Sequence, residues 1–160
     1  MGPTERLRDL DLELPAAPRL PPGHTTAFAW VRVLGARVLV SGHGPQQRDG
    51  APAGPFGRVP DAVSLDQAQR SARLSALSVM GSVQRAIGDL DRIAAWVSVA
   101  GFVQARPGFP ETTAVLNAFS DLVLDVFGPV VGAHTRTAIG VAALPLDLPV
   151  IVAAELALAG

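Results

Sequence analysis

Arg136 begins an almost wholly apolar stretch of the chain, residues 134–158, and its guanidinium is the group there that most needs a chemical partner. Burying that charge unpaired would cost several kcal/mol, so an anion is expected beside it. Arginine holds carboxylates through a planar two-pronged fork, which favours a carboxylate ligand from outside the chain. The alternative is a structural ion pair, with Glu155 or with a neighbouring subunit.

The three histidines are the other candidates for acid–base chemistry. His43 follows a predicted strand and either faces a cleft, where imidazole suits proton transfer near neutral pH, or is an exposed loop residue. His134 is interpreted as an interface residue or a catalyst, and His24 as inert. The chain has no cysteine, and no metal-ligand spacing, dinucleotide fingerprint, Walker lysine or nucleophile elbow is present, so neither a metal nor a cofactor is expected.

The elements that must position these residues follow from periodicity and turn residues. Of the 160 residues 49% are hydrophobic and 17% charged, which predicts one globular domain over residues 26–160 after an extended lead-in, residues 1–25. Ser64 and Gln67 have the spacing of a helix capping box. The predicted elements are strands at 27–34 and 37–42, a helix of about 25 residues from Ser64, a strand at 91–104, a helix from Pro110 or Glu111 to Gly128, and strands at 135–144 and 149–157.

This order, β-β-α-β-α-β-β, predicts an α+β fold with two helices on one face of a mostly antiparallel or mixed sheet. Alternation along the strands predicts that the helix-facing set includes Thr137 and Ile139. The opposite, helix-free face is then expected to hold Arg136, Ala138, Gly140, Ala142, Ile151, Ala153, Glu155 and Ala157. Burying that face in an oligomer would place a pocket, and Arg136, where subunits meet.

Charge and hydropathy exclude several classes of protein. The net charge is -1 and the isoelectric point about 6.3, so there is no basic footprint for nucleic acid. The N-terminus has no apolar signal core, and no uninterrupted apolar run approaches the roughly 20 residues that span a bilayer. No membrane partner is therefore expected, and the chain is predicted to be soluble and cytoplasmic.

Four segments of the chain form a recognisable set: "VLVSGHGP", "GDLDRIAAWVSVAGFVQARPGF", "VLNAFSDLVLDVFG" and "TRTAIGVAALP". They resemble the Rid family (reactive intermediate deaminases, YjgF-like), most of all its longer branch, and the likeness covers residues 20–158. The resemblance implies a chorismate-mutase-like fold of the Bacillus type. It also implies a homotrimer whose sheets form a central barrel, with three clefts between subunits.

The family's best-known activity implies the chemistry of that cleft, which is hydrolysis of 2-imino or enamino acids to 2-keto acids and ammonia. Arg136 matches the arginine that binds the substrate carboxylate. Ser41 and Gly42 match the cleft-lining Ser-Gly pair, and Asn117 matches a helix asparagine that supports the site.

The chain also departs from the family pattern. Phe28 stands where the family has a cleft tyrosine, Ala138 where it commonly has a cysteine, and His43 where glutamine is usual. Ile151 stands where the family carries the carboxylate that orients the attacking water. Glu155 lies four residues further along the same face, roughly 13 Å away at the rise of a strand.

Three functions remain open at this point. The first is a Rid-like enzyme that deaminates a small imine or enamine carboxylate in an inter-subunit cleft, with Arg136 as anchor and water activated by His43, Glu155 or backbone groups. The second is a non-catalytic trimer that binds a small carboxylate metabolite, motivated by the missing tyrosine and carboxylate. The third is a divergent Rid-fold enzyme of a specialised biosynthetic pathway, because the departures make the pocket more apolar and suit a larger substrate.

Overall fold

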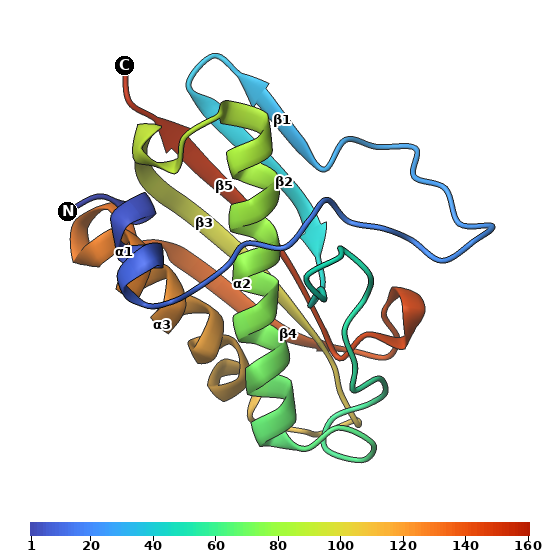
Figure 1. The fold of residues 1–160 in the computed structure, drawn as a ribbon. Coiled ribbons are helices and arrows are strands. Elements are labelled where there is room, and N and C mark those ends of the chain that lie inside the picture. The colour runs from blue at the N-terminus through green and yellow to red at the C-terminus, as the bar shows by residue number, and fades with distance from the viewer.

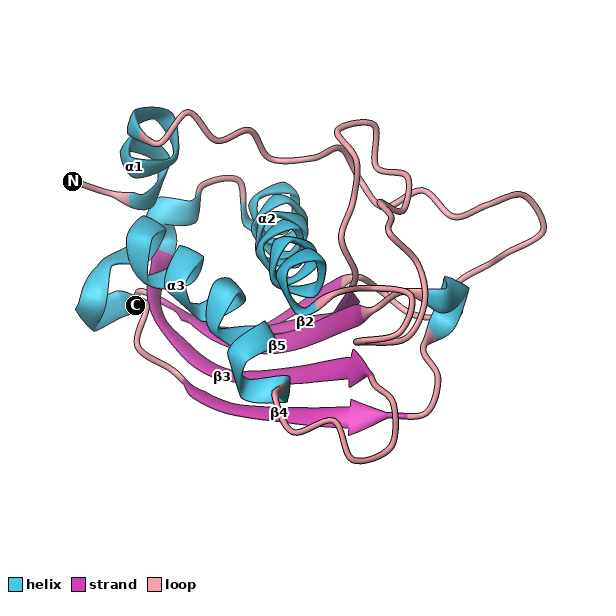
Figure 2. Ribbon diagram, turned by 90° about the horizontal axis from the view of Figure 1, so that it is seen from below, coloured by secondary structure: helices cyan, strands magenta, loops and turns pink.

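One five-stranded sheet carries two long helices on one of its faces, and the other face is bare (Figures 1 and 2). The structure is a computed structural model that describes residues 1–160. In chain order the elements are α1 (Pro3–Asp9), β1 (Val31–Leu34), β2 (Arg37–His43), α2 (Leu65–Ile87), the 3-10 turn η1 (Leu90–Arg92), β3 (Ile93–Gln104), α3 (Thr112–Val131), β4 (Thr135–Val141), the 3-10 turn η2 (Pro145–Asp147) and β5 (Val150–Leu158).

The strands lie in the order β1-β2-β5-β3-β4. All neighbouring pairs are antiparallel except β3 and β4, which run parallel and are joined through α3. The predicted α+β fold with a mixed sheet and two helices on one face is therefore confirmed. Strands β2, β3 and β4 point the same way, so their carboxyl ends meet at one edge of the sheet.

The helix α2 begins where the sequence predicted. Ser64 accepts a hydrogen bond from the Gln67 amide, and the Gln67 side chain accepts one from the Ser64 amide, which completes the capping box. The buried side chains of α2 are small in its first half and larger in its second half; they include Ala68, Ala72, Ala76, Val79, Met80 and Val83. This stripe packs on the sheet and on α3 in one hydrophobic core of 30 residues.

Two local predictions were wrong. Residues 1–25 are not wholly extended, because Pro3–Asp9 form α1, whose Leu7 packs into the core. The helix α3 does not end at Gly128, although Gly128 breaks the helical backbone with φ 82° and ψ 172°. Pro129 is suited to the first position of a helix, so the chain resumes one further helical turn to Val131.

The bare face of the sheet differs from the prediction at β4. In β5 the alternation is as predicted, with Val150, Val152 and Leu156 buried under the helices. In β4 it is inverted, since Arg136 pairs with the buried Val99 and shares its helix-facing side. Ile139, predicted to face the helices, lies on the bare face and is 49% exposed.

The helix α3 packs directly on this side of β4. A Cβ on Gly140 would lie 3.8 Å from the Thr112 side chain and 3.4 Å from that of Ala105. The Thr112 hydroxyl also donates to the Ala138 carbonyl at 3.0 Å. Arg136, Ala138 and Gly140 thus face α3, and Ile139 points away from it.

The bare face is consequently more apolar than a solvated sheet face. Phe102 of β3 has Ile139 of β4 on one side and Ile151 of β5 on the other. Ala100 is flanked in the same way by Thr137 and Ala153, and nothing in the chain covers this surface (Figure 2).

The helix α3 is the only element long and apolar enough to cross a membrane, with 20 residues and a mean hydropathy of 1.6. Its apolar residues are accounted for by the core, where Val115, Leu116, Phe119 and Val123 are fully buried.

Candidate functional site

Arg136 of β4 is held against α3 by uncharged acceptors. Its Nη1 donates to Ser120 Oγ at 2.8 Å, and its Nη2 donates to Asn117 Oδ1 at 2.9 Å and to the Thr113 carbonyl at 3.5 Å. The Nε–H and the second N–H of Nη1 have no partner in the chain. The guanidinium is thus fixed in orientation while it keeps free donors.

The hydroxyl of Ser120 links Arg136 to His134. Arginine only donates, so Ser120 Oγ accepts from it, and the same hydroxyl is hydrogen-bonded to His134 Nε2, 2.9 Å away. His134 Nδ1 lies 2.7 Å from the Gly132 carbonyl, which only accepts, so Nδ1 carries a proton and donates it there. His134 is therefore a support for the arginine.

No carboxylate of the chain neutralises Arg136. It makes no salt bridge, and Glu155, the intramolecular partner considered from the sequence, instead binds Arg37 at 2.7 Å on the bare face. Burial lowers the pKa of Arg136, an effect that the charge of Asp121 opposes. Arginine stays protonated in proteins, so the site is a partly desolvated cation without a counter-ion.

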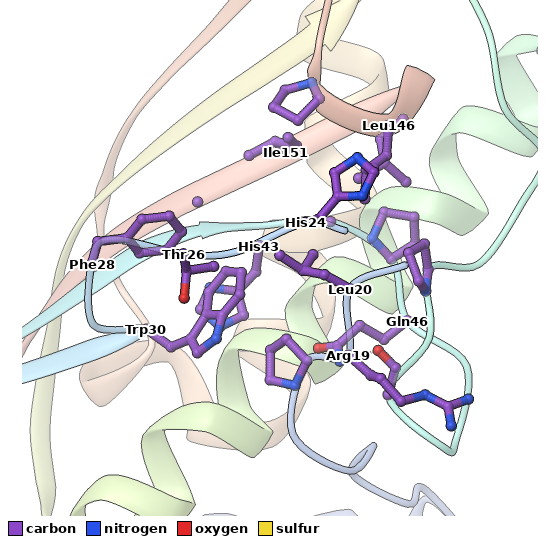
Figure 3. Close-up of a pocket in the computed structure, with 18 of the residues that line it drawn as sticks. Arg19, Leu20, His24, Thr26, Phe28, Trp30, His43, Gln46, Leu146 and Ile151 are labelled. Carbon is purple, nitrogen blue, oxygen red and sulfur yellow. Dashed lines mark hydrogen bonds between the residues drawn. The ribbon is translucent and has the colours of Figure 1, made fainter. Parts of the chain in front are cut away.

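A separate pocket of about 410 Å³ opens at the carboxyl end of β2 (Figure 3). It lies between the N-terminal segment, residues 18–30, the end of β2 and the η2 turn. Its lining residues are Pro18, Arg19, Leu20, His24, Thr25, Thr26, Phe28, Trp30, Gly42, His43, Gly44, Pro45, Gln46, Gly50, Pro52, Pro145, Leu146, Leu148 and Ile151. No carboxylate is among them.

His43 forms part of the pocket wall, but both of its ring nitrogens are occupied. The imidazole is 2% exposed; Nδ1 donates to the Ser41 carbonyl at 2.5 Å, and Nε2 accepts from Ser82 Oγ at 2.8 Å. Ser82 Oγ itself accepts from Arg85 at 3.2 Å. Burial and the charge of Arg85 lower the pKa of His43, although its hydrogen bond to Ser41 opposes them.

Sequence comparison finds close relatives along nearly the whole chain. Protein TCP17 of Trypanosoma cruzi is 37% identical over 144 residues, which are 90% of this chain and 86% of that protein. The crystal structure of Atu1372, a protein of unknown function from Agrobacterium tumefaciens, is 32% identical and has a TM-score of 0.86. The matched region covers 98% of this chain and 92% of the Atu1372 chain. No family model matches the sequence.

More distant solved structures share the fold. A protein of Shewanella oneidensis, named as a candidate endoribonuclease, has a TM-score of 0.87 at 24% identity over 99% of this chain and 100% of its own. YyfA of Yersinia pestis, a member of the Rid protein family, has a TM-score of 0.57 at 16% identity over 86% of this chain and 92% of its own. The chain belongs to the Rid (YjgF-like) family. Its fold is the chorismate-mutase-like fold of that family.

The residues predicted for a Rid cleft fall into three groups. Phe28, Gly42, His43 and Ile151 line the pocket. Arg136 and Asn117 lie together at α3, with Ala138 two residues along the same side of β4. Ser41 and Glu155 belong to neither group, since Ser41 Oγ donates to the Ala29 carbonyl at 2.7 Å and Glu155 is on the bare face.

The prediction that Arg136 shares a face with Ile151 and Glu155 is therefore wrong for a single Rid chain. Arg136 lies on the edge strand β4, separated from β2 and the pocket by β5 and β3. One chain holds an anion anchor and a pocket, and it does not bring them together.

The sequence analysis did not identify several residues of the Arg136 site and of the pocket. Ser120 could have been found, because it follows Asn117 by three residues and so shares its face of the helix. The Ser82–Arg85 pair on α2 and the pocket residues Leu20 and Gln46 gave no local pattern, since they meet β2 only through the tertiary fold.

Proposed function

We propose that this Rid protein is a homotrimeric deaminase of imine or enamine carboxylates. The observation that carries the proposal is the state of Arg136, a cation oriented by Ser120 and Asn117 and left without a carboxylate partner. Such a fork is suited to a ligand carboxylate, which would supply the missing charge.

The assembly part of the proposal rests on the bare sheet face and on the separation of anchor and pocket. A face that carries Phe102, Ile139 and Ile151 needs a cover, and copies of the same chain can supply one. A trimer would then form three clefts, each drawing Arg136 from one protomer and the pocket from its neighbour.

The reaction follows from the bound pose. With the carboxylate on Arg136, water adds to the imine carbon and the nitrogen takes a proton, which gives a carbinolamine. The carbon–nitrogen bond then breaks, the hydroxyl loses its proton to the departing nitrogen, and a 2-keto acid and ammonia are formed. The positive charge of Arg136 anchors the substrate carboxylate beside this centre.

Activation of the water is the step for which the chain offers the fewest candidate groups. His43 would have to give up its contact with Ser82 to take a proton, and Ile151 has no acceptor. Glu155 is bound to Arg37. Backbone carbonyls at the end of β2 are therefore the preferred acceptors in this proposal.

The test is acceleration of 2-iminobutyrate hydrolysis, with the imine generated in place and keto-acid release followed. Wild-type acceleration that is lost in Arg136→Ala is expected, whereas Arg73→Ala, an exposed arginine on α2, serves as the matched control. Arg136→Lys should recover little, because lysine keeps the charge and loses the fork. Unchanged turnover in Arg136→Ala would end the proposal.

A second candidate is a trimer that binds a carboxylate without turning it over, favoured by the absence of any carboxylate in the pocket lining. Ile151→Glu separates the two functions. Hydrolysis gained only in that variant, with ligand binding already present in the wild type, would mean that the anchor operates without a water activator.

A further inference from the structure

The pocket at the end of β2 has an aromatic wall. The Phe28 and Trp30 rings meet edge to face with centroids 5.0 Å apart, and the Trp30 and His43 rings are also 5.0 Å apart (Figure 3). Phe28 is 54% exposed, so its ring is still available to a ligand. Edge-to-face and offset arrangements of this kind extend readily to one more ring.

The rest of the pocket offers little to a charged or very polar group. Leu20, Leu146, Leu148 and Ile151 supply apolar surface. The one arginine in the lining, Arg19, is held by Asp49 at 2.6 Å. An apolar group entering the pocket would therefore displace water without stranding a charge.

One polar group in the lining lacks a partner. Gln46 is 8% exposed, and its amide nitrogen donates to the Gly50 carbonyl at 3.0 Å and to the Ala16 carbonyl at 3.3 Å. Its Oε1 is buried without a hydrogen bond. That oxygen has almost no exposed surface, so it offers no acceptor to a ligand in the pocket.

The size of the pocket also exceeds what a two- or three-carbon acid needs. About 410 Å³ lies within the range of roughly 300–1,000 Å³ typical of sites that enclose drug-sized ligands. A methyl side chain would leave most of that space unfilled, whereas a benzyl or indolyl group would reach the Phe28–Trp30 wall.

We propose that this pocket receives the aromatic side chain of the substrate, so that the protein acts on 2-imino acids derived from aromatic amino acids. The inference rests on the proposed function for the carboxylate end, held by Arg136, and adds the specificity at the other end. The substrate spans two protomers, with its ring in the pocket of one and its carboxylate on the arginine of the next.

Imines generated by an amino-acid oxidase from alanine, leucine, phenylalanine and tryptophan provide the kinetic test, with semicarbazide competing for the imine. We expect kcat/KM for the aromatic imines to exceed that for the alanine imine by about tenfold or more. Thr26→Phe, at the pocket lining, should abolish the preference, and Ala27→Phe, its exposed neighbour outside the lining, should retain it. Equal kcat/KM across the series in the wild type would overturn the proposal.

A binding test separates this inference from the proposed function. The chain has two tryptophans, and Trp96 is a core residue with 2% exposure, so Trp96→Phe leaves Trp30 as the sole reporter of the pocket. We expect 3-phenylpropionate and the uncharged 3-phenylpropanamide to change its emission, and propionate to leave it unchanged.

Arg136→Ala in the same Trp96→Phe background should weaken the binding of 3-phenylpropionate and leave the binding of 3-phenylpropanamide unchanged. If it weakens neither compound, the anchor of the proposed function fails while the pocket stands. If neither phenyl compound changes Trp30 emission, and Thr26→Phe changes nothing, the aromatic pocket fails whatever Arg136 does.

Discussion

The buried imidazole of His43 should make the fold sensitive to mild acid. Its Nδ1–H is committed to the Ser41 carbonyl, and its Nε2 accepts from Ser82, so the folded site is built for the neutral ring. A proton on Nε2 would remove that acceptor. It would also place a second cation against the hydroxyl that already accepts from Arg85.

The sign and size of the effect follow from proton linkage. The unfolded chain has a histidine pKa near 6.5, and burial first, then Arg85, lowers the pKa of His43 in the folded chain. Below about pH 6.5 the unfolded state therefore binds more protons than the folded state. The stability that neutral His43 contributes is fully present above that pH and is lost as the pH falls toward the folded pKa. One proton sets an upper limit of about 1.4 kcal/mol per pH unit, or about 1.3 kcal/mol between pH 7 and 5.5.

Urea unfolding at a fixed protein concentration measures this slope, because assembly would otherwise change the apparent stability. His43→Gln keeps an acceptor for Ser82 and removes the titration, so its unfolding free energy should fall less between pH 7 and 5.5 than that of the wild type. Val40→Ala weakens the same strand without touching the ring and should keep the wild-type slope. Equal slopes for the wild type and His43→Gln would refute the reasoning.

Three further predictions concern packing, capping and assembly. Gly101→Ala puts a Cβ about 2.5 Å from Leu116 Cδ1 and should lower the unfolding free energy by about 1–3 kcal/mol in urea titrations. Adding Leu116→Val should restore part of this loss. Full stability of the single variant would contradict the close approach of α3 to β3. Ser64→Ala removes the acceptor for the Gln67 amide and should cost about 1 kcal/mol by the same assay, and no loss would mean that the capping box contributes nothing. Ile139→Arg on the bare face should reduce the proposed trimer to monomers in sedimentation experiments, with exposed Val130→Arg on α3 as the control, and an unchanged mass would argue against that face as the interface.

The elements that the sequence predicted well are those with strong local patterns. The capping box at Ser64 lies within three residues of chain and positions α2 correctly. The alternation of β5 is correct because this strand is central, with the core on one side along its whole length. Neither prediction needed knowledge of a distant segment.

The face of Arg136 could not be predicted in this way. The expectation assumed that bulky side chains point to the helices, whereas in β4 Arg136 and its small neighbours face α3 and Ile139 points away from it. The polar contacts of Arg136 with Asn117 and Ser120 then satisfy it on the helix side. The pocket could not be predicted either, because residues 18–26 have no periodic pattern that would indicate where this segment lies over β2.

The distance between the anchor and the pocket within one chain has a consequence for mixed assemblies. Each cleft of the proposed trimer takes Arg136 from one chain and the pocket from another. Two variants with different defects can therefore each supply the part of the cleft that the other lacks. A trimer that mixes Arg136→Ala chains with Thr26→Phe chains contains some clefts in which a sound arginine meets a sound pocket, about one in four for random cyclic assembly. The two alleles expressed together would then recover hydrolysis of aromatic imines, whereas a site contained in a single chain would not recover it in any mixture.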